Sequence, residues 1–523
     1  MNKLAGGVIG VLVIAAAGIT GAAYWSGMKA ERWYEEALAE SAKSGNVKLS
    51  TVRYQRGLFS SHIITRVEIA KLESDDAPDP SFSIRQQVYH GPLPLAGWGT
   101  PGVPMRLTGA VVRATLDPDS SDWTRQLAKW YGNQEPILAI SQIGFDGASA
   151  TQITMPALTL NDVEDLQSLN YSGLQGQFQV GPKNTAVQGN LAIASLEMAS
   201  KPKVASEGQP AAGGEQVHLR DLTLTVDQRK GPFNLLFGES TFKIAELRAQ
   251  DPTSSSPFVM TGLSLTGALT QQNPQQVAGE LRVKADQVTM DQQSGTGSLH
   301  LALRNLDGAT VEKLQQWQQK ASSQPEDPQA LDDVLALVKT LLANKPEFML
   351  DTQAKMTQGD WQGQLTLNFQ DFDEANVLQN PTSLLGALEK GAADVAVSKT
   401  LVETVLTDQI MSELQSQAAE QEPPVDPQAL RSMAATQASQ QLQRLISAGF
   451  IKLDGDRYTT TARFADGKLF VNDREIPLTS PAGAEEGVIE EDIPMEPDGA
   501  EDDMSEEEMP MEPDGGTEEP AQQ

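Results

Sequence analysis

Histidine is the side chain that most often moves protons or binds metals near neutral pH, and this sequence has four histidines. They are His62, His90, His218 and His300. Each lies on or beside an expected β-strand, and no two have the spacing of a metal-ligand pair. The HExxH, P-loop, GxGxxG and GxSxG motifs are absent. The chain also has no cysteine, which excludes disulfides, thiolate metal sites, a cysteine nucleophile and a lipoprotein anchor.

Two of these histidines lie beside residues that could act with them. Ser60, Ser61 and His62 are adjacent, but a catalytic triad is defined by geometry and not by adjacency, so we interpret His62 as a strand residue that faces solvent. His90 lies in VYHGPLPL, residues 88–95, where a strand ends in a Gly-Pro-x-Pro kink. We expect a rigid strand exit in which His90 bonds a backbone carbonyl. A ligand-binding or catalytic role for His90 is the alternative.

Three carboxylates lie close together in the segment DPDSSD: Asp117, Asp119 and Asp122. Oxygen ligands at alternating positions could hold Ca²⁺. The glycine and the terminal glutamate of an EF-hand loop are missing, so a solvated turn is the simpler interpretation. We therefore expect no metal and no cofactor in this chain.

The segment YQRGLFSSHIITRVEIA, residues 54–70, has the pattern of two strands joined by a glycine turn. We expect Gly57 to supply a positive φ at this turn. After the turn, four apolar residues share one face at period two: Phe59, Ile63, Val67 and Ile69. Three polar residues share the other face: His62, Arg66 and Glu68. The pattern predicts a half-buried antiparallel pair, in which Phe59→Asp would destabilise the fold.

The same alternation recurs through residues 46–308, which we expect to form the first part of a β-rich domain. The alternating segments are 103–116, 137–145, 174–180, 190–198, 217–226, 240–249, 257–269, 279–290 and 297–306. Short, evenly spaced strands predict one or more large antiparallel sheets. There is no strict sequence repeat, only a recurring pattern.

Helical periodicity interrupts the strands further along the chain. Residues 309–345 form an expected helical insertion, with helices at 309–322 and 327–344. Strands return after it, and residues 346–480 are expected to mix strands with two more helices, 401–420 and 426–449. The last strands would turn at Asp454-Gly455 and Asp466-Gly467. The fold class is therefore mainly β with helical insertions (α+β).

Residues 4–27 carry no charge and are long enough, at roughly 30 Å or more as a helix, to cross a bilayer. We expect residues 1–27 to form a transmembrane anchor and residues 28–45 a juxtamembrane helix. The positive, very short amino terminus favours a single pass, with the bulk of the chain exported. A cleaved signal peptide is the alternative, because small residues near Gly21 could feed a signal peptidase.

The formal net charge is -31, and 17 of the 70 acidic residues lie between Glu485 and Gln523. That segment has no lysine or arginine. A chain so acidic, with no basic stripe, should be repelled by nucleic-acid phosphates, so we expect no nucleic-acid partner. Residues 481–523 cannot bury apolar surface and are expected to be a disordered acidic tail.

Three motifs together resemble one family. YQRGLFSS begins at Tyr54 and includes Arg56, HGPLPL runs from His90 to Leu95, and FADGKL begins at Phe464. This set is similar to the YdgA-like family of Gram-negative bacteria, whose function is unknown. The resemblance covers residues 1 to about 480. It implies an inner-membrane anchor and a large periplasmic domain, but no activity, cofactor or catalytic residue.

The resemblance marks the following residues as family-motif positions: Tyr54, Arg56, Gly57, Phe59, Ser60, Ser61, His90, Gly91, Pro92, Pro94 and Leu95. The plan of the chain, an anchor followed by many amphipathic strands, also has a looser likeness to AsmA-like envelope proteins. We therefore expect a non-enzymatic inner-membrane protein that binds or guides an apolar envelope component in the periplasm, with lipid among the candidates. A protein-interaction or assembly factor is the alternative. An enzyme would need polar groups that converge around His90.

Overall fold

The computed structural model describes most of the chain between residues 47 and 477. The described residues are 47–57, 59–69, 81–90, 94–163, 165–202, 214–252, 254, 256–290, 293–323, 330–371, 386–418 and 426–477. All of them belong to the first of two compact units, Met1–Leu478, and the second unit is Thr479–Gln523.

Several sequence predictions lie outside the described residues. They concern the anchor at 4–27, the helix at 28–45, the tail at 481–523, and the motif residues Gly91 and Pro92. Among the helices that the structure describes, none is both long and apolar enough to cross a membrane. The anchor therefore stays a prediction from sequence.

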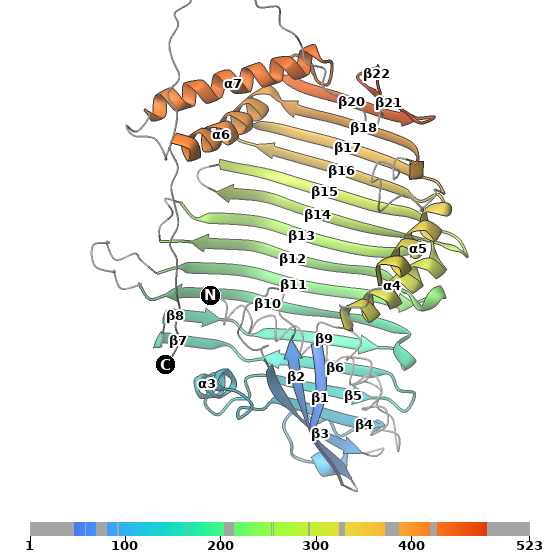
Figure 1. Cartoon of the computed structure of the whole chain (residues 1–523). Coiled ribbons are helices and arrows are strands. Elements are labelled where there is room, and N and C mark those ends of the chain that lie inside the picture. The colour runs from blue at the N-terminus through green and yellow to red at the C-terminus, as the bar shows by residue number, and fades with distance from the viewer. Residues whose placement is uncertain are drawn as a thin grey trace, which may run out of the picture. The chain divides into compact units, whose positions relative to one another are not determined.

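An antiparallel sheet of 22 strands makes up most of the described chain (Figure 1). Its first six strands pair in chain order: β1 (Val47–Arg56), β2 (Ser60–Ile69), β3 (Ser81–His90), β4 (Ala110–Leu116), β5 (Leu138–Ile143) and β6 (Ser149–Met155). Strand β6 then pairs with β9 (Leu174–Val180), and β9 pairs with β10 (Ala186–Ser200). The β1–β2, β5–β6 and β9–β10 connections are short turns, and the longer connections also join strands that are neighbours in the sheet.

Strand β10 is a branch point, because two strands share one of its edges. Its first half pairs with β9, and its second half pairs with β8 (Leu166–Tyr171). Strand β7 (Leu158–Val163) pairs with β8 in turn. The helix α3 (Asp122–Tyr131) lies against this small branch, since Tyr131 is buried with residues of both strands.

From β10 onward the sheet is a long meander. The strands that follow in order are β11 (Gln216–Lys230), β12 (Leu236–Gln250), β13 (Phe258–Gln271), β14 (Gln276–Met290), β15 (Gln293–Asp307), β16 (Glu347–Met356), β17 (Gly359–Phe369) and β18 (Leu388–Ser398). Strand β18 pairs with β20 (Arg457–Ala465). Three short strands complete the sheet: β19 (Lys452–Asp454), β21 (Lys468–Val471) and β22 (Arg474–Ile476).

Two helical pairs interrupt the meander, as the sequence predicted. The first consists of α4 (Gly308–Ser323) and α5 (Ala330–Ala343), between β15 and β16. The second consists of α6 (Lys399–Ala418) and α7 (Pro427–Ser447), between β18 and β19. Each pair meets the sheet near one end of its strands, where α4 contacts β15 and α6 contacts β17, β18 and β20. The helices therefore leave the middle of the strands without a helical cover in the described part of the chain.

The prediction of a mainly β fold with a large antiparallel sheet and helical insertions is confirmed. The predicted turns are also confirmed, since Gly455, Asp466 and Gly467 have positive φ angles of 60°, 52° and 72°. Five elements were missed: α3, β6, β7, β8 and β18. Helix α3 has only ten residues. Strand β18 is rich in alanine, which favours helix in isolation and is overridden here by pairing with β17 and β20.

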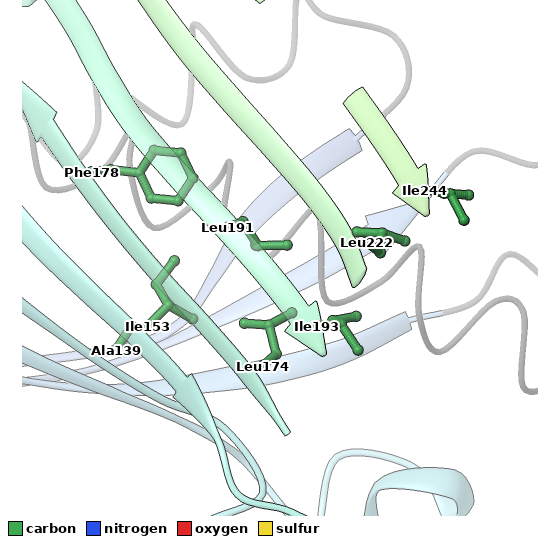
Figure 2. Close-up of a cluster of buried hydrophobic side chains, with 8 residues drawn as sticks. All are labelled: Ala139, Ile153, Leu174, Phe178, Leu191, Ile193, Leu222 and Ile244. Atoms are coloured by element: carbon green, nitrogen blue, oxygen red, sulfur yellow. The ribbon is translucent and has the colours of Figure 1, made fainter. Parts of the chain in front are cut away.

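The largest buried cluster lies where the first strands meet the meander (Figure 2). It consists of Ala139, Ile153, Leu174, Phe178, Leu191, Ile193, Leu222 and Ile244. These side chains come from β5, β6, β9, β10, β11 and β12. A second cluster contains Val67, Phe82 and Leu116 from β2, β3 and β4. Ala114 and Met155 pack against both clusters, so the amino-terminal strands help to cover the start of the meander.

Candidate functional site

The strands of the meander have two chemically different faces, because successive residues of a strand point to opposite sides. One face carries an aligned row of polar residues that crosses nine strands: Asn190, Thr225, Thr241, Thr266, Arg282, His300, Asp351, Gln364 and Asp394. Side chains on this face bond one another. For example, the amide of Gln364 donates to the Asp351 carboxylate at 3.2 Å. We call it the polar face.

The opposite face is apolar along the same strands. One of its rows consists of Leu191, Leu224, Phe242, Leu265, Val283 and Leu299. The next row consists of Leu281, Leu301, Leu350, Leu365 and Ala393. A third consists of Leu303, Phe348 and Leu367. We call the part between β13 and β17 the apolar face, made of Leu265, Leu281, Val283, Leu299, Leu301, Leu303, Phe348, Leu350, Leu365 and Leu367.

The exposure of these rows changes along the sheet. Leu191 of the first row is buried, and so are Leu222 and Ile244 of the neighbouring row on the same face, whereas Leu224 and Phe242 are partly buried. From β13 onward no residue of the apolar face is buried, and Leu281 is 40% exposed. The meander therefore begins as part of a closed core and continues as an apolar surface that the described residues leave partly open.

A line of backbone irregularities lets the strands stay apolar on one side over their whole length. The strand pairing is interrupted at one line across β10 to β14, where Ala194, Asp221, Ala245, Gly262 and Asp286 lie between residues that are paired on both sides. Asp221 and Gly262 have positive φ angles of 48° and 62°. We call this line the seam.

The apolar positions change parity at the seam. On β11 they are Leu222 and Leu224 on one side of it and Leu219 on the other. All three pack on the same cluster, as Phe242 and Leu247 of β12 also do. Without such a shift, strict alternation would turn half of the strand toward the wrong side. The seam therefore extends the apolar side along strands of 14 or 15 residues.

The two amino-terminal family motifs meet in space through the pairing of β2 with β3. The backbone N–H of His90 donates to the carbonyl of Phe59 at 2.9 Å. The Ser61 hydroxyl lies 2.8 Å from Nε2 of His90. The imidazole of His90 therefore has a serine hydroxyl as its partner, and the prediction that it bonds a backbone carbonyl was wrong.

A serine beside a histidine is the geometry of an activated nucleophile, but burial decides its use here. Ser61 is fully buried, at 0% exposure, so a substrate has no approach to its hydroxyl. Desolvation by burial lowers the pKa of His90 below 6.5, and the nearby Arg56 charge lowers it further. His90 is then neutral near pH 7 and can bond Ser61 without a charge. We assign this pair to the structure of the corner between β2 and β3.

Gly57 has a different role from the one predicted. It is not among the glycines with positive φ. Its N–H donates to the carbonyl of Ser60 at 2.8 Å, and a Cβ at this position would lie 2.7 Å from the same oxygen. The residue must be glycine because the chain approaches itself closely, and not because of its φ angle.

The predicted inward face of the hairpin is only partly correct. Ile63 and Val67 are buried and Ile69 is partly buried, but Phe59 is 64% exposed. Phe59 lies in the turn before β2 begins at Ser60, so the alternation of the strand does not extend to it. The inward position next to Ile63 belongs to Ser61 instead.

The remaining motif residues have separate surroundings. Tyr54 packs against the buried cluster of Ile63, Val88 and Ile143. Pro94 is fully buried, whereas Leu95 after it is exposed. His62 is exposed, as predicted for the outward face of its strand. The motif residues that the structure describes thus have separate surroundings at a folded corner.

The three clustered carboxylates are engaged by arginines. Arg85 pairs with Asp117 at 2.6 Å and with Asp119 at 3.0 Å, while Asp122 pairs with Arg125. A cation at this turn would have to displace Arg85. Within the described ranges, no group of three or more His, Asp or Glu side chains is arranged to hold a metal ion.

Comparison with known proteins places this chain in a family. The family described as "Bacterial protein of unknown function (DUF945)" matches residues 1–479. The Escherichia coli (strain K12) protein named Protein YdgA is 23% identical over 530 residues, which cover 91% of this chain and 95% of that protein. An uncharacterized protein of Haemophilus influenzae is 32% identical over 103 residues, or 18% of this chain and 26% of that protein. No solved structure matches.

Proposed function

This chain belongs to the DUF945 family of bacterial proteins of unknown function, and we propose that it binds an elongated apolar molecule, such as the acyl chains of an envelope lipid, on its apolar face. The role is to hold or guide the ligand, without catalysis. The observation that carries this proposal is the row of four aligned leucines from β14 to β17, Leu281, Leu301, Leu350 and Leu365, none of which is buried. The other residues of the apolar face flank this row.

Binding would be driven by the removal of water from the apolar surfaces of the protein and the ligand. Burial of each CH₂ group of a ligand contributes about 0.8 kcal/mol. The apolar face offers ten apolar side chains in three rows, with no charged residue among them. An extended hydrocarbon chain that crosses several strands would cover these leucines, whereas a compact polar ligand would find no partner there.

The proposed location is the periplasmic side of the inner membrane, with residues 4–27 as the anchor. The uncharged stretch at residues 4–27 supports it, because as a helix it is long enough to cross a bilayer. Release into the periplasm after cleavage of a signal peptide is the alternative. Either location would place the apolar face within reach of envelope lipids.

Photocrosslinking in cells can test the ligand with neighbouring positions of one strand. We would introduce p-benzoylphenylalanine at Leu281 or Leu301 of the full chain, and at Arg282 or His300 as matched controls. Each control is next in sequence to its test position, but it lies on the polar face. After irradiation, adducts are purified and analysed by mass spectrometry.

Lipid adducts at Leu281 and Leu301, and none at Arg282 and His300, are the expected result. Equal labelling of both faces would contradict a specific apolar site. One dominant protein adduct from the apolar face would replace the proposal with the second candidate, a protein-interaction or assembly factor of the envelope. The buried hydroxyl of Ser61 gives the enzyme alternative no support.

A further inference from the structure

The turns at one end of the strands carry an unusual group of exposed apolar side chains. Five of them are between 60% (Leu95) and 77% (Trp98) exposed: Phe59, Leu95, Trp98, Leu107 and Phe145. They come from three separate connections, namely the β1–β2 turn, the β3–β4 segment and the β5–β6 turn.

The strand register places these connections side by side. Tyr89 is paired with Ser60, and His90 with Ala110. Ala110 is paired with Ile143, and Ile143 with Ser149. All three connections therefore lie at the same strand ends. We call this end the loop edge.

The loop edge continues into two turns of the meander. Val180 is paired with both Ser149 and Val187, which brings the β9–β10 turn next. The β11–β12 turn follows, since Lys230 N–H donates to the carbonyl of Thr185 at 2.8 Å.

The charge of the loop edge is opposite to that of the chain. Its segments are Arg56, Gly57 and Phe59 with residues 94–109, 144–148, 181–185 and 229–235. They contain five basic residues, all exposed: Arg56, Arg106, Lys183, Arg229 and Lys230. They contain one carboxylate, Asp146, which accepts a hydrogen bond from the Ala148 N–H within its own turn. The whole chain has a net charge of -31.

We propose that the loop edge inserts Phe59, Leu95, Trp98, Leu107 and Phe145 into the interface of an anionic phospholipid bilayer. This contact would be additional to the predicted anchor and does not depend on the ligand of the apolar face. Tryptophan prefers the interface between headgroups and acyl chains, and basic residues beside it attract anionic lipids.

The spacing of the side chains favours a bilayer over a protein partner. The exposed side chains project from three separate connections, and a fluid interface accepts such separate projections without a matching pocket for each one. The basic residues give the contact its dependence on lipid charge.

A unique cysteine can report this contact in the full chain, because the sequence has no native cysteine. We would label Leu107→Cys with an environment-sensitive NBD fluorophore. The control is Met290→Cys, because Met290 is 60% exposed, similar to Leu107 at 72%, but lies at the opposite strand end of β14. Both proteins are reconstituted in phosphatidylcholine vesicles, with or without phosphatidylglycerol, and each preparation contains a nitroxide lipid as quencher.

We expect several-fold stronger quenching at Leu107 than at Met290 in the anionic vesicles, and a loss of this difference at high salt. Arg106→Glu with Lys183→Glu should reduce the quenching while the melting temperature stays unchanged. Equal quenching at the two labels would overturn the proposal, as would equal quenching at Leu107 in neutral and anionic vesicles. A label that stays in water, together with a protein crosslink from position 107 in cells, would assign the loop edge to a protein partner instead.

Discussion

Ser61 and His90 are 29 positions apart in sequence and meet because β2 and β3 are paired. Ser61 is fully buried and His90 is partly buried, and their side chains lie within hydrogen-bond distance of each other. Gly57 and Pro94 have similar structural roles, one through close backbone approach and one through burial. These four motif residues therefore stabilise the corner between β2 and β3 through hydrogen bonding and close packing.

The pH dependence of stability should reveal the state of His90. Its pKa is lowered in the folded chain, so between pH 6.5 and that lower value the unfolded chain binds a proton that the folded chain does not. Its contribution to stability is present above pH 6.5 and is lost as the pH falls. When the pH is lowered from about 7.5 to about 5, the melting temperature of the His90→Gln variant should therefore fall less than that of the native chain. Parallel melting curves for both proteins would contradict this.

A pair of substitutions in the hairpin separates its buried and exposed apolar residues. Ile63→Ala should lower the free energy of unfolding by about 2–5 kcal/mol, because Ile63 is 1% exposed. Phe59→Ala should change it by less than about 0.5 kcal/mol, since the ring faces solvent. Phe59→Asp is accordingly no longer expected to unfold the domain. Chemical denaturation of the variants measures both effects, and a larger loss at Phe59 would refute the assignment.

At the scale of elements, the seam explains how long strands serve one apolar side. A strand of 14 or 15 residues with unbroken alternation accumulates twist. The apolar side chains at its two ends would then no longer point in the same direction. The aligned irregularities on five neighbouring strands reset the alternation at one line. Gly262 is the position where this reset requires a special residue, because its φ is 62° and a Cβ would lie 2.1 Å from the Asp286 carboxylate.

Substitution at Gly262 tests whether the seam matters for stability. Gly262→Ala should cost about 1–3 kcal/mol through backbone strain and contact with Asp286. Gly267→Ala in the same strand is the matched control, because a Cβ there meets open space and its φ is not positive. The control should change stability by no more than about 0.5 kcal/mol. Equal losses of stability in the two variants would mean that the seam does not require glycine at position 262.

At the scale of the whole sheet, one apolar side is used in two ways. Its first part is buried in the cluster of Figure 2, which stabilises the fold. Its second part, the apolar face, is left partly open by the described residues and is available to a ligand. In our proposal, stability and ligand binding therefore belong to different strands of the same sheet.

Charged substitutions should separate these two parts. Leu191→Glu places a carboxylate in the buried cluster and should lower stability by about 3 kcal/mol or more. Leu301→Glu lies on the apolar face and should leave the melting temperature nearly unchanged, while it reduces lipid adducts formed from position 281. Thermal unfolding and the crosslinking assay measure the two effects. Unfolding of the Leu301 variant, or undiminished adducts, would place Leu301 in the core instead.

Local patterns were enough for much of the fold. Period-two alternation predicted nine strand segments, and the Asp-Gly pairs predicted two turns, because side-chain direction and turn geometry are properties of neighbouring residues. The helices α4, α5, α6 and α7 were equally visible in their periodicity.

What only the tertiary structure decided concerns contacts between distant strands. The branch at β10, the alignment of the seam, the contact of Ser61 with His90 and the outward position of Phe59 all depend on which strands pair and where each one begins. The alternating pattern predicts that a strand has an apolar side. The pattern does not differ between a strand whose apolar side is covered and one whose apolar side is open. Coverage is set by long-range packing, and for this reason the buried start and the open continuation of the apolar side became visible only in the folded sheet.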